Sequence, residues 1–181
     1  MSEDYTSGMD GHATDNPEAL LLAALLITRN EDELHRQVDR LRVADLYETN
    51  YAAVFATIKN QLAQHRPCDA ASIRSALRAQ GENSGIPLCD VDSLIQMLTT
   101  LDVNPFTLDS YAQQVASASY RRQFAAMTTT LARLADTAAE DELYTLFVEE
   151  GHKQRQARAR YETFLGDNQN NQDKPNNEHT Q

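Results

Sequence analysis

Glycine is scarce in this 181-residue chain, and none of the six glycines belongs to a loop pattern that binds nucleotide phosphates. Neither GxxxxGKS/T nor GxGxxG occurs, although ATP-driven motors and dinucleotide-binding enzymes depend on such loops. We therefore predict that these residues bind no cofactor and have no ATPase or helicase activity.

Cysteine is also rare, because only Cys68 and Cys89 are present, too far apart to form a CxxC unit. The five histidines are scattered, and none has a serine or cysteine partner at a spacing typical of a catalytic triad. We expect two reduced, structural cysteines. The sequence predicts no metal site and no catalytic residue.

Long apolar runs are missing as well. A membrane-spanning helix needs roughly 20 consecutive apolar residues, and no segment approaches that length. The apolar run Ala19–Ile27 lacks the basic front and the small-residue cleavage site of a secretory signal. The expected location is the cytoplasm, without membrane association.

Basic residues are outnumbered, and the formal net charge of −11 argues against a protein that binds duplex DNA. One basic cluster stands out, at Lys153, Arg155, Arg158 and Arg160. It could contact a nucleic acid or an acidic partner, or it could complement the negative end of a helix dipole. We expect direct DNA binding to be weak or absent.

What the chain does contain is a series of helix start signals. Asp15 or Asn16 can cap a first helix that has Pro17 at its first position. Asn30 and Asp69 are suited to cap two later helices. No segment alternates with period two for long enough to predict a strand, so we predict an all-α fold.

Apolar residues recur at helical spacing and predict a common core in the first part of the chain. Leu22 and Leu26 lie on the first helix, and Phe55 and Ile58 lie on the third. We expect these four side chains to be buried together, with Tyr51 as a further core aromatic. A short helix around Ser93–Leu98 should close this head.

A long helical hairpin is predicted after the head. Pro105 ends whatever packs before it, because proline cannot continue a regular helix. Thr107 is a suitable N-cap for a helix that continues to about Ala135, and a second arm, Ala139–Gln156, follows a short acidic break. The expected architecture is a compact helical head followed by a projecting antiparallel helical hairpin.

We divide the chain into four parts on these signals. They are a disordered acidic tail (1–14), the helical head (15–105), the helical hairpin (106–160) and a polar disordered tail (161–181).

The first arm of the hairpin carries two apolar tracks, which implies two packing partners. One partner is the second arm, whereas the other track could bind a partner protein or pack end-on against the head. The candidate partner-binding residues are Tyr120, Phe124, Met127, Leu131, Leu143 and Phe147.

Three segments together resemble the N-terminal domain of DnaB-family replicative DNA helicases. They are PEALLLAALLI, VADLYETNYAAVFATIKNQLAQHRPCD and SYAQQVASASYRRQF, in the family's order, and the similarity covers nearly all of Asn16–Phe147. Matching positions include Glu18, Leu22, Leu26, Tyr47, Phe55, Ile58, Pro67, Asp69, Tyr111, Ala112, Val115 and Arg122. Cys89-Asp90 departs from the family, which usually has Gly-Gly before the sixth helix.

In that family this domain forms a collar, pairs hairpins between subunits, and docks primase and loading factors. The resemblance implies a protein–protein interaction module of the primosome in DNA replication, partnered with a replicative helicase, a primase or a loader. It also implies a homo-oligomer, a dimer, through the hairpin. The family's motor domain has no counterpart in this sequence, so helicase activity is not implied. Two alternatives stay open: a fragment of a full-length helicase, and a small helical transcription regulator that binds DNA.

Overall fold

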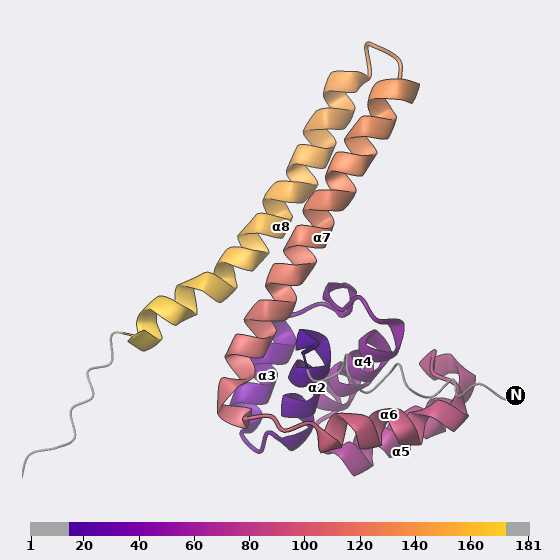
Figure 1. Ribbon diagram of the computed structural model, residues 1–181, viewed down its shortest axis with the longest axis vertical. Helices are drawn as coiled ribbons and strands as arrows, with labels where there is room; N and C mark the ends of the chain where they lie inside the picture. The colour runs from indigo at the N-terminus through magenta and orange to yellow at the C-terminus, as the bar shows by residue number, and fades with distance from the viewer. Residues whose placement is uncertain (1–14, 173–181) are drawn as a thin grey trace, which may run out of the picture. The chain divides into compact units, whose positions relative to one another are not determined.

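The computed structural model describes residues 15–172, and every regular element in that range is helical. The predicted all-α fold is therefore confirmed. The chain divides into two compact units, an N-terminal unit, Met1–Val115, and a C-terminal unit, Ala116–Gln181 (Figure 1). The predicted tail 1–14 and the last part of the other predicted tail, 173–181, lie outside the described residues.

The N-terminal unit is built around helix α2. Its α-helices are α2 (Pro17–Ile27), α3 (Glu31–Arg40), α4 (Thr49–Ala63), α5 (Ala70–Gln80) and α6 (Leu88–Thr100). Three 3-10 helices connect them: η1 (Val43–Asp45), η2 (Gly81–Ser84) and η3 (Pro105–Thr107). Helix α2 packs against α4, α6 and η3, and α5 packs against α4 and α6. The apolar first helix therefore forms the centre of this unit, as predicted.

Three helices of this unit begin where the sequence predicts. The side-chain oxygens of Asn16, Asn30 and Asp69 accept hydrogen bonds from first-turn N–H groups of α2, α3 and α5, at 2.9–3.2 Å. These bonds satisfy donors that have no partner within the helix. Of the two possible caps for α2, the structure uses Asn16, with Pro17 at the next position.

The predicted core is present. Leu22, Phe55 and Ile58 are fully buried, and Leu26 is 5% exposed. Tyr51 differs from the prediction, because it is only half-buried at the edge of α4. Even so, its partial burial raises the pKa of its hydroxyl above the usual value.

A buried carboxylate joins α2 to the start of α4. Glu18 is 5% exposed, and its two oxygens accept hydrogen bonds from the backbone N–H groups of Tyr47 and Glu48, at 2.8 and 3.1 Å. Glu48, the N-cap residue of α4, supplies no side-chain cap of its own. Glu18 therefore replaces the missing cap from another helix.

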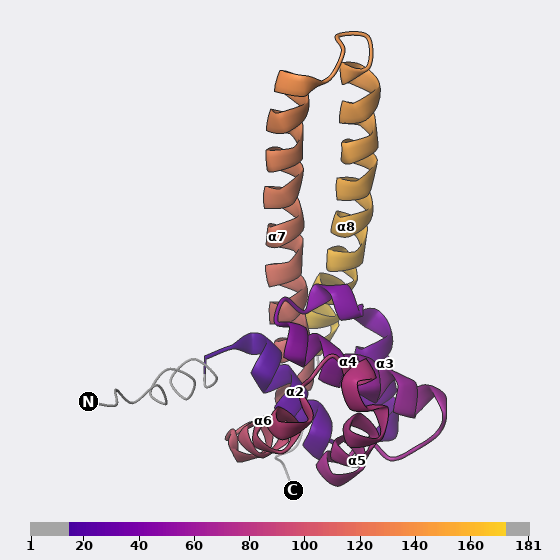
Figure 2. The same cartoon turned by 90° about the vertical axis from the view of Figure 1, so that its right-hand side faces the viewer.

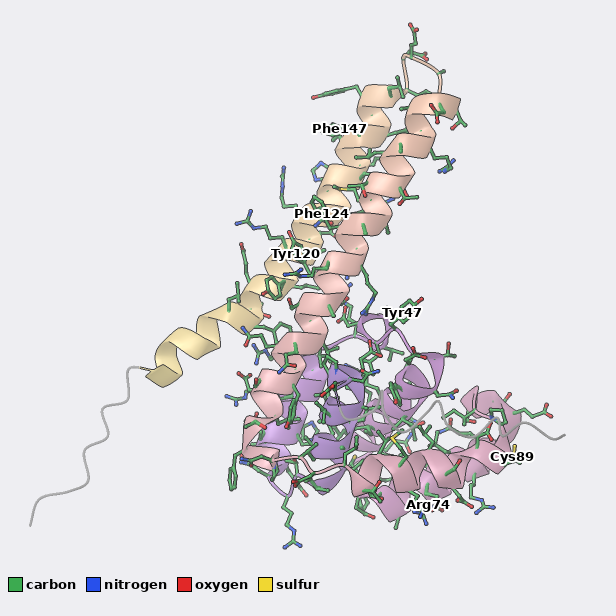
Figure 3. All side chains as sticks on the ribbon, in the orientation of Figure 1. Tyr47, Arg74, Cys89, Tyr120, Phe124 and Phe147 are labelled. Carbon is green, nitrogen blue, oxygen red and sulfur yellow. The ribbon has the colours of Figure 1, made fainter. Side chains whose placement is uncertain are left out.

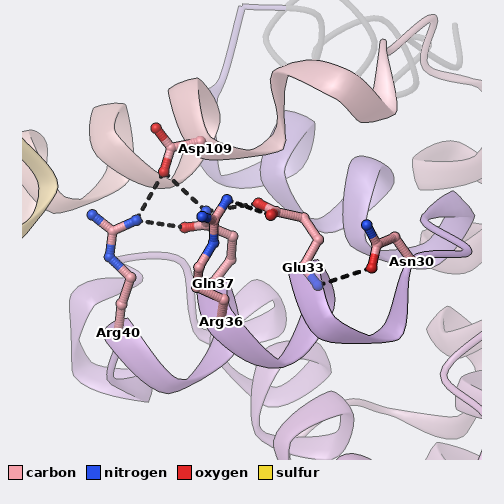
Figure 4. Close-up of polar contacts among 6 residues, drawn as sticks. All are labelled: Asn30, Glu33, Arg36, Gln37, Arg40 and Asp109. Atoms are coloured by element: carbon pink, nitrogen blue, oxygen red, sulfur yellow. Dashed lines mark hydrogen bonds and ion pairs between the residues drawn. The ribbon is translucent and has the colours of Figure 1, made fainter. Parts of the chain in front are cut away.

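A polar cluster ties α3 to the first turn of α7 (Leu108–Thr137), inside the N-terminal unit (Figure 4). One carboxylate oxygen of Asp109 accepts from Gln37 at 2.9 Å and from Arg40 at 2.8 Å. Gln37 is fully buried and also donates to Glu33 at 2.8 Å. Asp109 therefore has two roles: its charge lies at the positive end of α7, and it forms a specific ion pair with Arg40.

The start of α7 differs from the prediction in one detail. The helical run begins one element earlier, with η3, and Asn104 rather than Thr107 caps it: the Asn104 side-chain oxygen accepts from the N–H of Phe106 at 3.0 Å. The Thr107 hydroxyl donates to the Asn104 carbonyl at 2.8 Å. The reason is Pro105, which occupies the first position of η3, directly before α7. The helical conformation therefore begins at Pro105 and not after Thr107.

Two helices are longer than predicted. Helix α6 begins at Leu88, directly after Pro87, rather than at Ser93. Helix α8 (Leu143–Gln172) runs past the predicted ends of both the second arm, Gln156, and the hairpin, residue 160. Its Arg, Gln and Ala residues favour helix, and extending an existing helix is easier than starting one. Although α7 and α8 each have 30 residues, neither they nor the other described helices are apolar enough to cross a membrane.

Candidate interaction surface

The C-terminal unit is a pair of antiparallel helices, the later part of α7 and α8, which lie side by side in both views (Figure 2). The rings of Tyr120 and Tyr161 stack across the pair, with centroids 5.3 Å apart and planes at 7°. The guanidinium of Arg160 donates to the side-chain oxygen of Gln123 at 3.0 Å. These two contacts fix the register of the arms.

The seam between the arms is only partly covered. Met127, Leu131 and Leu143 are half-buried, and no residue from Arg121 to Gln156 is classed as buried. Two helices bury one narrow stripe of each other, whereas a four-helix bundle encloses such residues on all sides. The arms therefore leave apolar side chains available to a partner.

Large aromatic side chains on the arms are exposed as well (Figure 3). Phe124 is 48% exposed, Phe147 is 58% exposed and Tyr144 is 76% exposed. Tyr144 was not among the predicted residues, although its position three residues before Phe147 places it on the same face of α8. At the register of the tyrosine stack, Phe147 lies opposite Leu134, about 15 Å along the hairpin from Phe124. The predicted partner-binding residues thus lie along the arms rather than in one cluster.

The predicted basic cluster does not form one patch. Lys153, Arg155, Arg158 and Arg160 all belong to α8, but their spacings place Arg155 and Arg158 on one face of the helix and Lys153 and Arg160 on the other. Lys153 forms an ion pair with Glu150, and the Nε of Arg158 lies 2.8 Å from Glu162. The bond to Glu150 raises the pKa of Lys153. The positive charge is therefore partly balanced by acidic neighbours on the same helix.

A cleft of about 620 Å³ lies in the N-terminal unit, where α2 and α4 end. Leu26, Leu34, Leu62, His35 and His65 contribute to its lining, together with Cys68. Among the described residues, no group of three or more His, Cys, Asp or Glu side chains is placed to hold a metal ion. The lining therefore gives no indication of metal chemistry.

The two cysteines should differ strongly in reactivity. Cys68 is buried, and burial, with a smaller effect of Asp69 and Glu31, raises its pKa to about 11. At pH 8 only about a thousandth of this thiol is ionised, whereas Cys89 is exposed. We expect iodoacetamide to modify Cys89 rapidly and Cys68 slowly in the folded protein, as measured by mass spectrometry. Cys89→Ser should remove the rapid reaction; a rapid reaction that persists in this variant would contradict the prediction.

Comparisons with known proteins agree with this fold. A family model described as DnaB-like helicase N terminal domain matches residues 13–117. The crystal structure of the N-terminal domain of DnaB helicase from Mycobacterium tuberculosis aligns with a TM-score of 0.61 and 20% sequence identity, over 76% of this chain and 94% of that chain. No curated protein gave a significant match. The family match covers more than half of this chain, and the chain therefore belongs to the DnaB-like helicase N-terminal domain family.

Proposed function

We propose that this chain acts in DNA replication as a protein–protein interaction module, with no helicase motor activity of its own. Membership of a replicative-helicase domain family supports the assignment to DNA replication. The observation that carries the finer proposal is the partly covered seam of the arms, in which no residue from Arg121 to Gln156 is buried. Such a surface is typical of a helix pair completed by another protein.

The partners that this surface suits are a second copy of the chain, the collar of a replicative helicase, or a primase or loader that docks there. Phe124, Met127 and Leu131 follow one another at spacings of three and four, so a partner helix can cover all three. Burying one large apolar side chain contributes about 2 kcal/mol to association. A few such contacts are enough for micromolar pairing after the cost of association is subtracted.

The test is the double variant Phe124→Ala/Leu131→Asp, compared with the wild type by sedimentation velocity and by binding to purified helicase and primase. We expect it to be monomeric and to lose binding, while its far-ultraviolet circular dichroism is unchanged. Phe106→Ala/Thr129→Asp is the matched control, because Phe106 is 95% exposed in the other unit and Thr129 is exposed on α7. This control should behave like the wild type.

Unchanged sedimentation and unchanged partner binding in Phe124→Ala/Leu131→Asp would overturn the proposal. If the chain is part of a longer helicase, the same surface would serve there. The family match does not favour a DNA-binding transcription regulator. Recovery of specific promoter DNA without any replication protein, in a pull-down from native extract, would support that alternative instead.

A further inference from the structure

The cleft of about 620 Å³ in the N-terminal unit has a largely aliphatic floor. Its four buried lining residues keep 5–8% of their surface exposed, whereas the large side chains at the centre of the unit keep 0–1%; the four are Leu26, Leu34, Leu62 and Cys68. Their remaining exposed atoms therefore face the cleft. Such a floor gains by covering an apolar group, and the volume is typical of sites that hold a ligand.

Basic side chains line the same cleft without an intramolecular partner. Arg29 lies in the turn before α3, and His35 lies on α3. His65 and Arg66 lie in the turn between α4 and α5. Within residues 15–172, none of these four side chains makes a hydrogen bond or an ion pair. Several arginines elsewhere in this unit are paired with carboxylates instead. The basic groups of the cleft are therefore available to a ligand.

His65 occupies a backbone position at which glycine is the usual residue. It follows the C-cap of α4, and its φ of 53° lies in the left-handed region. Its N–H donates to the carbonyl of Leu62 at 2.9 Å. The next N–H, of Arg66, donates to the carbonyl of Gln61 at 2.9 Å, which completes a Schellman motif. A Cβ crowds the backbone in this conformation, so glycine would be more favourable. The imidazole is therefore kept at a place where the fold itself does not favour it.

Two carboxylates also line the cleft, but only one of them is uncommitted. Asp69 accepts from the Ser72 hydroxyl at 2.6 Å and from the N–H groups of Ser72 and Ala71 at 3.1 and 2.9 Å. These bonds, above all that from the hydroxyl, lower the pKa of Asp69. The side chain of Glu31 makes no hydrogen bond or ion pair with any residue that the structure describes. The uncommitted groups are thus two guanidiniums and two imidazoles against one carboxylate, which favours an anionic ligand.

We propose that this cleft binds an acidic peptide segment that carries a bulky aliphatic side chain. The aliphatic chain covers the floor, and the aspartates or glutamates next to it pair with Arg29, His65 and Arg66. A peptide suits the site better than a compact anion, because the basic groups come from two separate turns, 28–30 and 64–69, and carboxylates spaced along a chain can meet both. The site lies wholly within the N-terminal unit and is independent of the proposed function of the arms.

Arginines also bind the phosphates of nucleic acids, but the lining favours a peptide. Proteins that hold single strands stack the bases on aromatic side chains. The described residues that line this cleft include no phenylalanine, tyrosine or tryptophan. An aliphatic floor instead matches the side chain of leucine or isoleucine. Binding of an oligonucleotide is therefore an outcome of the test and not the proposal.

The experiment measures binding of a fluorescein-labelled peptide, Asp-Glu-Asp-Leu-Leu-Asp-Glu, to the full chain by fluorescence anisotropy. We expect saturable binding with a Kd of about 10–100 µM. A peptide with serine in place of both leucines should bind about tenfold more weakly or worse, because it leaves the floor uncovered. A peptide with lysine in place of every acidic residue should not bind, because its charges repel the two arginines.

Variants of the chain locate the site. Arg29→Glu/Arg66→Glu should raise the Kd by about tenfold or more without changing the melting temperature, because both side chains are exposed. Arg121→Glu, at an exposed arginine in the other unit, is the matched control and should leave the Kd unchanged. His65→Gly should raise the melting temperature and yet raise the Kd by about threefold or more. A histidine with only a structural role would not affect the Kd.

Peptide binding should also strengthen as the pH falls from about 8 to about 6, because histidine side chains gain a proton in this range. The other charged residues of the lining are arginines and carboxylates, whose types keep their charge over the same range: Arg29, Glu31, Arg66 and Asp69. Burial raises the pKa of Cys68 to about 11, so this thiol stays neutral. We expect the Kd to fall by about threefold or more in the wild type, and to be independent of pH in His35→Gln/His65→Gly.

Three results would overturn this inference. The first is no binding of the acidic peptide up to about 1 mM, and the second is an unchanged Kd in Arg29→Glu/Arg66→Glu. The third is displacement of the peptide by hexanoate or by a single-stranded oligonucleotide at a lower concentration than by unlabelled peptide, which would assign the cleft to that ligand. Phe124→Ala/Leu131→Asp should bind the peptide like the wild type, so a failure of the proposed function and a failure of this inference give different results.

Discussion

Phe55→Ala is expected to lower the free energy of unfolding by about 3–5 kcal/mol. Phe55 is fully buried in the core, with an exposed fraction of 0%. The ammonium of Lys59 also lies 5.7 Å from the centre of its ring. Removal of the ring leaves a cavity in the core of the N-terminal unit, and native domains are stable by only about 5–15 kcal/mol. Guanidinium denaturation followed by circular dichroism measures the loss.

Phe106→Ala is the matched control for this experiment, because the same ring is removed from a side chain that is 95% exposed. We expect a change of less than about 0.5 kcal/mol. A Phe55→Ala variant that loses no more stability than this control would show that α4 is peripheral and that the core described above is wrong.

Glu18→Ala should produce the second-largest loss, about 2 kcal/mol, without removing any apolar packing. The carboxylate accepts from the N–H groups of Tyr47 and Glu48, and both donors lose their acceptor in the variant. An unsatisfied buried donor costs about 1–3 kcal/mol, and water reaches part of this site because Tyr47 is 72% exposed. Urea denaturation at neutral pH measures the loss.

Two further substitutions serve as controls for the stability loss in Glu18→Ala. Glu18→Gln keeps one acceptor oxygen and should lose less stability than Glu18→Ala, which separates the hydrogen bonds from simple side-chain burial. Glu82→Ala changes an exposed glutamate in η2 and should be nearly neutral. Equal stability of Glu18→Ala and Glu82→Ala would mean that α4 begins without help from α2.

The sequence predicted those parts of the fold that depend on neighbours along the chain. Asn16, Asn30 and Asp69 cap helices as expected, because a cap acts on N–H groups only two or three residues away. The core positions of α2 and α4 were also predictable, since helical periodicity alone places Leu22 and Phe55 on apolar faces.

Contacts between distant segments were not predictable in this way. Gln37 looks like an ordinary surface residue, yet it is fully buried against Asp109, which lies 72 residues away. Glu18 likewise caps a helix that starts about 30 residues later. Neither pairing leaves a periodic signal.

The candidate surface was predicted only in part, for a related reason. Phe124 and Phe147 were identified from apolar spacing, and both are exposed. Whether an apolar residue such as Leu131 or Leu143 is covered depends on the register of the arms, which the stack of Tyr120 and Tyr161 determines. Tyr144 was not predicted at all, and its exposure became evident only in the structure.

Helix α7 belongs to both units, since residues 108–115 lie in the N-terminal unit and the remainder lies in the C-terminal unit. Asn104 caps η3, which leads directly into α7, and Asp109 ties the first turn of α7 to α3. A fragment cut at the unit boundary, before Ala116, would begin in mid-helix with four backbone donors that lack acceptors. The arms therefore cannot be moved to another protein as an isolated segment. Without residues 104–115, the helices would fray from the end where Tyr120 and Tyr161 stack.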